Sequence, residues 1–118
     1  MAGKYLIGAA LLLLAAPAFA EDWDFVLVNK TGKTIKAVET SDAGAAQWAK
    51  ERLEEDMANG PVRAGQSHTV HFDKQGCKLD VRLTFTDDSQ AVFSGFDVCD
   101  YAFADFSFKG ELPVVKGS

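Results

Sequence analysis

Cysteine and histidine are scarce in this chain, which has two of each among its 118 residues. The cysteines, Cys77 and Cys99, lack the Cys-x-x-Cys spacing of zinc sites and dithiol redox motifs. The histidines, His68 and His71, lie in a segment with the composition of a strand, where a spacing of three places side chains on opposite faces. We therefore expect two partly exposed strand histidines, no metal site and no cofactor.

Basic residues are outnumbered by acidic ones. Twelve Lys and Arg stand against seventeen Asp and Glu, which gives a formal net charge of −5. Phosphate backbones and anionic lipids repel a domain of this charge. We expect no nucleic-acid partner, which leaves an unidentified protein or a small ligand as the partner.

Motifs of common enzymes are also absent. A phosphate-binding loop around Gly32 would need a glycine at position 27, which is Leu27. The triplet Lys30-Thr31-Gly32 occurs in penicillin-binding enzymes, but their Ser-x-x-Lys motif is missing here, and no nucleophile elbow supports a Ser-His-Asp triad. We expect no catalytic residue. The alternative is a small periplasmic hydrolase with a loop-built site using His68, His71 and Asp88.

The one long apolar run stands at the N-terminus, in residues 1–20. Lys4 precedes an apolar stretch that ends in Ala18-Phe19-Ala20, as in a secretory signal peptide with cleavage between Ala20 and Glu21. The stretch is shorter than the roughly 20 apolar residues of a membrane anchor. No cysteine lies near the cut and no arginine pair precedes it. We expect a Sec-type signal, no lipid anchor, no membrane span after cleavage, and a periplasmic or secreted protein.

Cleavage would leave 118 − 20 = 98 residues, which suffice for one domain. Removing Lys4 leaves eleven basic against seventeen acidic residues, a formal charge of −6. We expect a single β-rich domain over residues 21–110. The segment 111–118 has no clear period, and we expect it to be a flexible C-terminal tail.

Most of the remaining chain has the pattern of strands and turns. Residues 23–29 and 34–40 are β-type runs around a Gly-containing connection, which predicts a hairpin. Alternation is strict from residue 77 to 85, with one face apolar: Cys77, Leu79, Val81, Leu83 and Phe85. In the last strand, residues 101–108, alternation weakens near Ala104 and predicts a bulge or bend there.

Residues 42–58 change period. Ala45, Ala49, Leu53 and Met57 recur every four residues, which predicts one amphipathic helix ending at Asn59-Gly60-Pro61. Three acids, Glu54, Glu55 and Asp56, crowd its carboxyl end against the helix dipole. They are either a solvated face or an acidic patch for a basic partner.

The two cysteines could be a metal pair, a redox pair, a nucleophile with a spare, or a structural disulfide. An even cysteine count in an exported chain favours the disulfide. Cys77 opens one predicted strand and Cys99 follows the next, so a hairpin would bring them together. We expect a Cys77–Cys99 bridge, with Cys77 buried on the core face of its strand.

The order of these features resembles a group of small exported bacterial proteins, mostly uncharacterised, with an N-x-T-G hairpin and a C-x-x-D … D-x-C disulfide pattern. The matching segments are Phe25–Gly32, Trp48, Cys77–Val81 and Phe96–Cys99. Some members carry the label argininosuccinate lyase. True lyases of that name are long helical tetramers with a serine-rich signature loop, and this chain has neither the length nor the loop. The resemblance implies export, a disulfide and a mainly β fold, and it supplies no catalytic residue.

Together these patterns predict one small antiparallel β-sandwich or partly open barrel of about six strands, with one helix between strands two and three. The function we expect is that of a non-catalytic envelope protein, a binding or interaction module. Oligomeric state is open at this point.

Overall fold

A computed structural model describes residues 21–53, 61–74 and 76–118. The chain there forms nine strands, namely β1 (Glu21–Asn29), β2 (Ile35–Asp42), β3 (Ala49–Lys50), β4 (Arg52–Leu53), β5 (Ser67–Lys74), β6 (Lys78–Phe85), β7 (Gln90–Asp97), β8 (Phe103–Lys109) and β9 (Leu112–Gly117). The expected signal peptide and the acid cluster Glu54, Glu55 and Asp56 lie outside the described residues.

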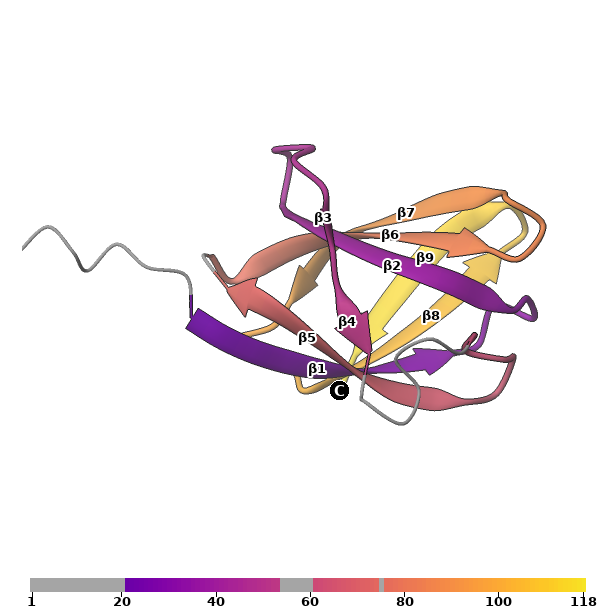
Figure 1. Cartoon of the computed structure of the whole chain (residues 1–118), viewed down its shortest axis with the longest axis horizontal. Coiled ribbons are helices and arrows are strands. Elements are labelled where there is room, and N and C mark those ends of the chain that lie inside the picture. Colours follow the sequence, from indigo (N-terminus) through magenta and orange to yellow (C-terminus); the bar gives the residue numbers. More distant parts are fainter. Residues whose placement is uncertain (1–20, 54–60, 75) are drawn as a thin grey trace, which may run out of the picture.

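The strands form two sheets that face each other (Figure 1). One has the order β4-β5-β1-β8-β9 and the other the order β3-β2-β6-β7. All described pairings between strands are antiparallel except that of β1 with β8, which is parallel. The expected mainly β sandwich is confirmed. It has more strands than expected, and one of its sheets is mixed.

Both sides of the sandwich are partly closed. On one side the chain passes from β3 in one sheet to β4 in the other, with Glu51 between them. On the other side β7 and β9, the edge strands of the two sheets, pack against each other. The sheets thus approach each other along both pairs of edge strands. Open space between them can occur at the two ends of the sandwich, where the strands begin and stop.

The core lies between the sheets and is rich in phenylalanine. Phe25 of β1 lies 5.3 Å from Phe96 of β7, and Phe93 meets Phe106 edge-on at 5.0 Å, measured between ring centroids. In β6 the strict alternation has the expected result, because Leu79, Val81, Leu83 and Phe85 are all buried. A strand directs alternate side chains to one face, so the alternation in the sequence determines which β6 side chains enter the core.

The expected helix over residues 42–58 is wrong for its described part. Residues 42–53 form a turn and the short strands β3 and β4, and 54–58 lie outside the described residues. Gly44 and Ala46 have φ values of +82° and +52°, which a right-handed helix cannot contain. The backbone N–H of Gln47 donates to the Ser41 hydroxyl, and β3 pairs with β2. These contacts outweigh a weak helical period.

The expected hairpin between the first two strands is also wrong, because β1 and β2 belong to different sheets. The connection crosses the sandwich and is organised by Asn29, whose side chain is fully buried. Its Nδ2 donates to the carbonyls of Lys33 (2.7 Å) and Val62 (2.9 Å). Its Oδ1 accepts from the backbone N–H and the hydroxyl of Thr31.

The C-terminal segment is a strand where we expected a flexible tail. Strand β9 pairs with β8 throughout, and Val115 packs against the core opposite Phe106. The bulge expected near Ala104 is absent from the pairings of β8. A register shift occurs between β6 and β7 instead, beside Gly95, whose φ is +77°.

Within the described ranges there is no helical segment with the length and apolar character that crossing a membrane requires.

Candidate ligand-binding site

The histidines and Asp88 do not assemble into a site. His68 lies on the core face of β5, where its exposed fraction is 6%, and His71 lies on the opposite face and is half-buried. The opposite faces were predicted correctly, whereas the partial exposure was wrong for His68. Asp88 lies in the β6–β7 turn with its side chain 81% exposed and paired with Lys36. None of the hollows described below is lined by any of these three residues.

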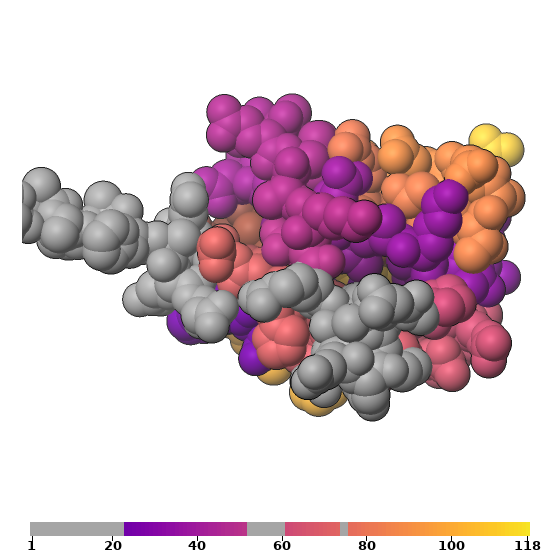
Figure 2. All heavy atoms as spheres, viewed as in Figure 1, coloured from indigo at the N-terminus to yellow at the C-terminus, as the bar shows by residue number. Residues whose placement is uncertain are grey.

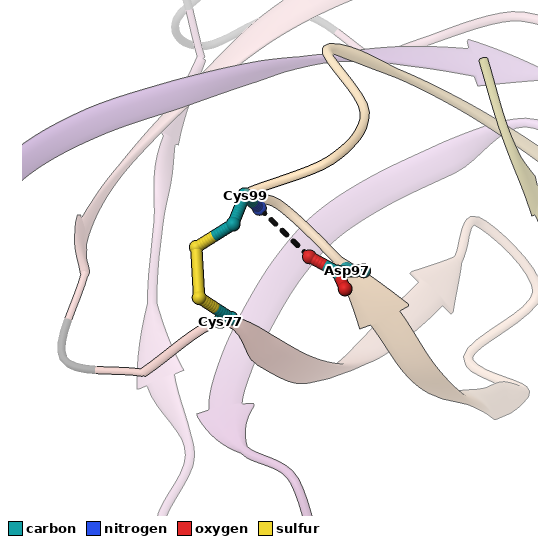
Figure 3. Close-up of side chains that lie close together, drawn as sticks. All are labelled: Cys77, Asp97 and Cys99. Carbon is teal, nitrogen blue, oxygen red and sulfur yellow. Dashed lines mark hydrogen bonds between the residues drawn. A yellow bond between two sulfur atoms is a disulfide. The ribbon is translucent and has the colours of Figure 1, made fainter.

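The Cys77–Cys99 disulfide is present, with a Cα–Cα distance of 5.2 Å (Figure 3). Cys77 precedes β6 and is exposed, so the expectation of a core-facing cysteine is wrong. Asp97 lies beside the bridge, and its Oδ1 accepts the backbone N–H groups of Cys99 (2.9 Å) and Asp100 (3.1 Å). The two sulfurs and an Asp97 carboxylate oxygen lie within 4.8 Å of one another. Because the sulfurs are bonded to each other and are not thiolates, they form a crosslink and not a metal centre.

Asp80, the acid of the C-x-x-D pattern, also accepts hydrogen bonds that stabilise the fold. Its Oδ1 accepts the N–H of Gly95 at the β6–β7 irregularity (3.0 Å), and its Oδ2 accepts the N–H of Gly44 in the β2–β3 connection (2.9 Å). Asp80 therefore ties this connection to the sheet. Together with Asn29 and Asp97, it shows that the polar residues of the sequence patterns hold the fold in place.

A hollow opens between the sheets at the end where β2 stops and β6 begins. We call it the mouth hollow, and its volume is about 470 Å³. The β2–β3 connection, which forms one wall, projects from the body of the molecule (Figures 1 and 2). The lining includes Thr40, Asp42, Glu51, Phe72, Asp73 and Leu79.

The inner face of β2 explains why this end is open and polar. Val38, Thr40 and Asp42 alternate along that face, opposite Leu83, Val81 and Leu79 of β6. The face therefore changes from apolar to polar toward the mouth. Thr40 is buried, and its hydroxyl donates to a Glu51 carboxylate oxygen that reaches across from the end of β3.

The mouth hollow is acidic. Three acidic residues, Asp42, Glu51 and Asp73, line it together with one basic residue, Lys50. Its floor is apolar, formed by the core residues Phe72 and Leu79. An apolar floor with a few polar groups above it is the usual composition of a small-molecule site.

Two carboxyl groups outside the hollow have lowered pKa values, which stabilise their charged forms. The Arg82 side chain, hydrogen-bonded to Glu39 at 2.8 Å, lowers the pKa of that carboxyl. Hydrogen bonds from the hydroxyl and the backbone N–H of Ser89, and then Lys33, lower the pKa of Asp87 to about 2. Carboxyl groups held in their ionised form serve as structural anions and not as general acids at neutral pH.

A second hollow, of about 630 Å³, lies at the opposite end of the sandwich and is more open. Phe85, Phe108 and Pro113 line it, and Lys33 lies over the Phe85 ring at 5.0 Å. Lys33 also pairs with Asp87 and hydrogen-bonds Ser89, so its charge is already engaged.

The residues of the mouth hollow were not identified from the sequence. One signal was present, because Thr40 and Asp42 continue the alternation that Val38 begins, and polar residues on a core face point to a site or an opening. The expected helix obscured this signal, since it assigned residues 42–53 to a different element.

No protein-family model and no curated protein matches this chain. An NMR structure of a protein from Eubacterium rectale is similar at 14% sequence identity and a TM-score of 0.46, over 82% of this chain and 88% of that one. Function is therefore inferred from the geometry of this chain alone.

Proposed function

We propose that this protein is a non-catalytic binding module that takes up a small, positively charged polar ligand in the mouth hollow. The observation that carries the proposal is the change of the β2 inner face from apolar to polar at an opening between two sheets. A volume of about 470 Å³ suits a metabolite-sized ligand.

The charges and the floor define the ligand class. Three carboxylates against one lysine favour a cation, and the Thr40 and Gln47 side chains offer further hydrogen-bonding groups. Phe72 and Leu79 would contact an apolar part of the ligand. A short-chain ammonium or guanidinium compound fits this combination better than an anion or a neutral lipid.

Binding without catalysis is supported by how the hydroxyls of the hollow are engaged. The Ser41 hydroxyl donates to the Asp42 carbonyl and accepts from Gln47, and the Thr40 hydroxyl donates to Glu51. No histidine or cysteine is among the described residues that line the hollow. A hydroxyl nucleophile would need a neighbouring base to activate it, and a carboxylate at neutral pH is a weak one.

An extracytoplasmic location belongs to the same proposal. It is supported by the signal-like segment at residues 1–20 and by the disulfide, since disulfides persist mainly in oxidising compartments. A periplasmic or secreted binding module would meet small cations at the cell envelope.

Titration of the folded protein with arginine, spermidine and glucosamine, followed by calorimetry and amide NMR, tests this proposal. We expect at least one of them to bind and to shift the amide signals of residues 40–51. Asp42→Asn and Asp73→Asn should weaken binding, whereas Asp105→Asn, an acid that pairs with Lys30 outside the hollow, should not. Absence of binding by all three probes, or equal loss in the control variant, would contradict the proposal.

A further inference from the structure

A third hollow, of about 480 Å³, lies beside the disulfide and has two aromatic side chains in its lining. Trp23 at the start of β1 is 37% exposed, and Tyr101 before β8 is 43% exposed. Asp24 and Asp100 line the same hollow. We call it the aromatic hollow, and it shares no lining residue with the mouth hollow.

The wall that carries Tyr101 is held in place by several contacts. Cys99 is fixed by the disulfide, and Val98 beside it is buried in the core. The backbone N–H of Tyr101 donates to the Asp97 carbonyl at 3.1 Å. The Tyr101 ring lies directly against Gly117 of β9, where an added Cβ would overlap it. The ring is thus positioned before any ligand arrives, which reduces the entropy lost on binding.

The opposite wall belongs to strand β1 of the sheet. Trp23 stands across the β1–β5 ladder from the buried Phe72, and the N–H of Val26 donates to the Ala102 carbonyl at 2.9 Å, which joins the two walls. The hollow is therefore bounded by two parts of the chain that the fold holds together.

Acidic side chains, and no basic one, are among the described residues that line the aromatic hollow. Across the described part of the chain neither Asp24 nor Asp100 takes part in an ion pair, and no lysine or arginine is among the lining residues described. Aromatic faces attract cations through their quadrupole, and carboxylates attract them through their charge. A neutral sugar could stack on the rings and donate hydroxyl hydrogen bonds to the carboxylates, but only a cation also gains the charge attraction of both.

We infer that the aromatic hollow is a second ligand site, which binds an alkylammonium group between Trp23 and Tyr101 with Asp24 and Asp100 as counter-charges. This site is independent of the proposed function, because it uses different residues. Its ligand is defined by a positively charged, alkyl-substituted nitrogen, which occurs in free small cations and in methylated lysine side chains.

Choline and its uncharged isostere 3,3-dimethylbutan-1-ol form the decisive pair of probes. The two have the same shape, so a difference between them reports the charge. In the variant Trp48→Phe, fluorescence and the indole N–H signal report on Trp23 alone. We expect choline to shift both signals saturably and the neutral isostere to bind at least about fivefold more weakly.

Variants of the walls test the assignment to these residues. We expect Tyr101→Leu, and the pair Asp24→Asn with Asp100→Asn, each to weaken choline binding by about fivefold or more. Asp105→Asn, which removes an acid outside both hollows, should leave the choline-dependent shift of the Trp23 signals unchanged. Amide NMR spectra of each variant confirm that it is folded. Tyr101→Phe keeps the ring and should retain choline binding, so it tests the role of the ring even if Tyr101→Leu does not fold.

Two outcomes would overturn the inference: no saturable shift of the Trp23 signals with choline, or equal affinity for choline and the neutral isostere. An amidated, acetylated trimethyllysine distinguishes the sources of the cation. Binding of choline alone identifies a free small cation, and binding of both identifies a site that also accepts a side chain. Failure at the mouth hollow leaves this result unaffected, because the probes report on separate residues.

Discussion

Asn29 shows how one buried polar side chain can determine the path of the chain. All four hydrogen-bonding positions of its amide are used, two as donors and two as acceptors. We expect Asn29→Ala to lower the free energy of unfolding by about 2 to 4 kcal/mol, since it removes these bonds and leaves a cavity. Urea unfolding measures the change.

The control for Asn29 is Gln90→Ala, which removes an exposed amide that donates only to the Thr84 hydroxyl. Exposed substitutions of this kind change stability by no more than about 0.5 kcal/mol. Similar effects of the two variants would show that Asn29 does not organise the crossing between the sheets.

Asp87 should make the protein sensitive to acid. Ser89, through its hydroxyl and backbone N–H, and then Lys33 lower the pKa of Asp87 from its ordinary value of 3.8 to about 2. A carboxyl whose pKa is lower in the folded state stabilises the fold above the unfolded pKa, and this contribution is lost as the pH falls through the folded value. We expect Asp87→Asn to flatten the decline of the melting temperature between about pH 4 and pH 2.

Ser89→Ala provides the matched test of the cause. It removes the hydroxyl that donates to Asp87 at 2.5 Å but keeps the carboxylate. The pKa of Asp87, followed by carboxyl-carbon NMR, should rise toward its ordinary value in this variant. An unchanged pKa would assign the shift to the backbone N–H of residue 89 and to Lys33 instead.

At the scale of elements, the β2–β3 connection depends on Asp80. Its carboxylate is shared between the amides of Gly44 and Gly95, and Arg82 on the same face of β6 lies 4.7 Å from the Trp48 ring. We expect Asp80→Ala to accelerate hydrogen exchange at both glycine amides by about tenfold or more, because each loses a charge-assisted bond worth about 1.5 to 3 kcal/mol. Asp88→Ala is the control, and equal exchange in both variants would contradict this role.

The elements differ in how far the sequence predicts them, for physical reasons. β6 is predictable because its alternation is local and complete from Leu79 to Phe85. The connection after β2 is not predictable in this way, because its Ala and Leu spacing suggests a helix. Hydrogen bonds to Ser41 at the end of β2 and to Asp80, far along the chain, decide the outcome. Likewise, no local pattern around Gly32 tells a hairpin from a crossing between sheets, since the difference lies in which strands become neighbours.

At the scale of the molecule, the candidate sites lie where the two sheets and their connections leave space. The sequence predicts a sandwich from its strands and a disulfide from its two cysteines. It does not predict the hollows at the ends of the sandwich, because they form where residues of different sheets, such as Phe72 and Leu79 at the mouth hollow, come together in three dimensions. The mouth hollow and the aromatic hollow both combine residues from segments far apart in the chain.

The mature molecule should be one processed, crosslinked chain, and a single measurement tests both properties. β1 begins at Glu21, where cleavage is expected, and Glu21 pairs with Lys74, so the first residue after the cut belongs to the described ladder. Intact mass of the exported protein without reductant should equal residues 21–118 less the hydrogens of both thiols. Ala18→Arg, which disrupts the cleavage site, should leave the longer precursor. Alkylation of both cysteines in native exported protein would contradict the bridge, and an uncut chain would contradict export by this signal.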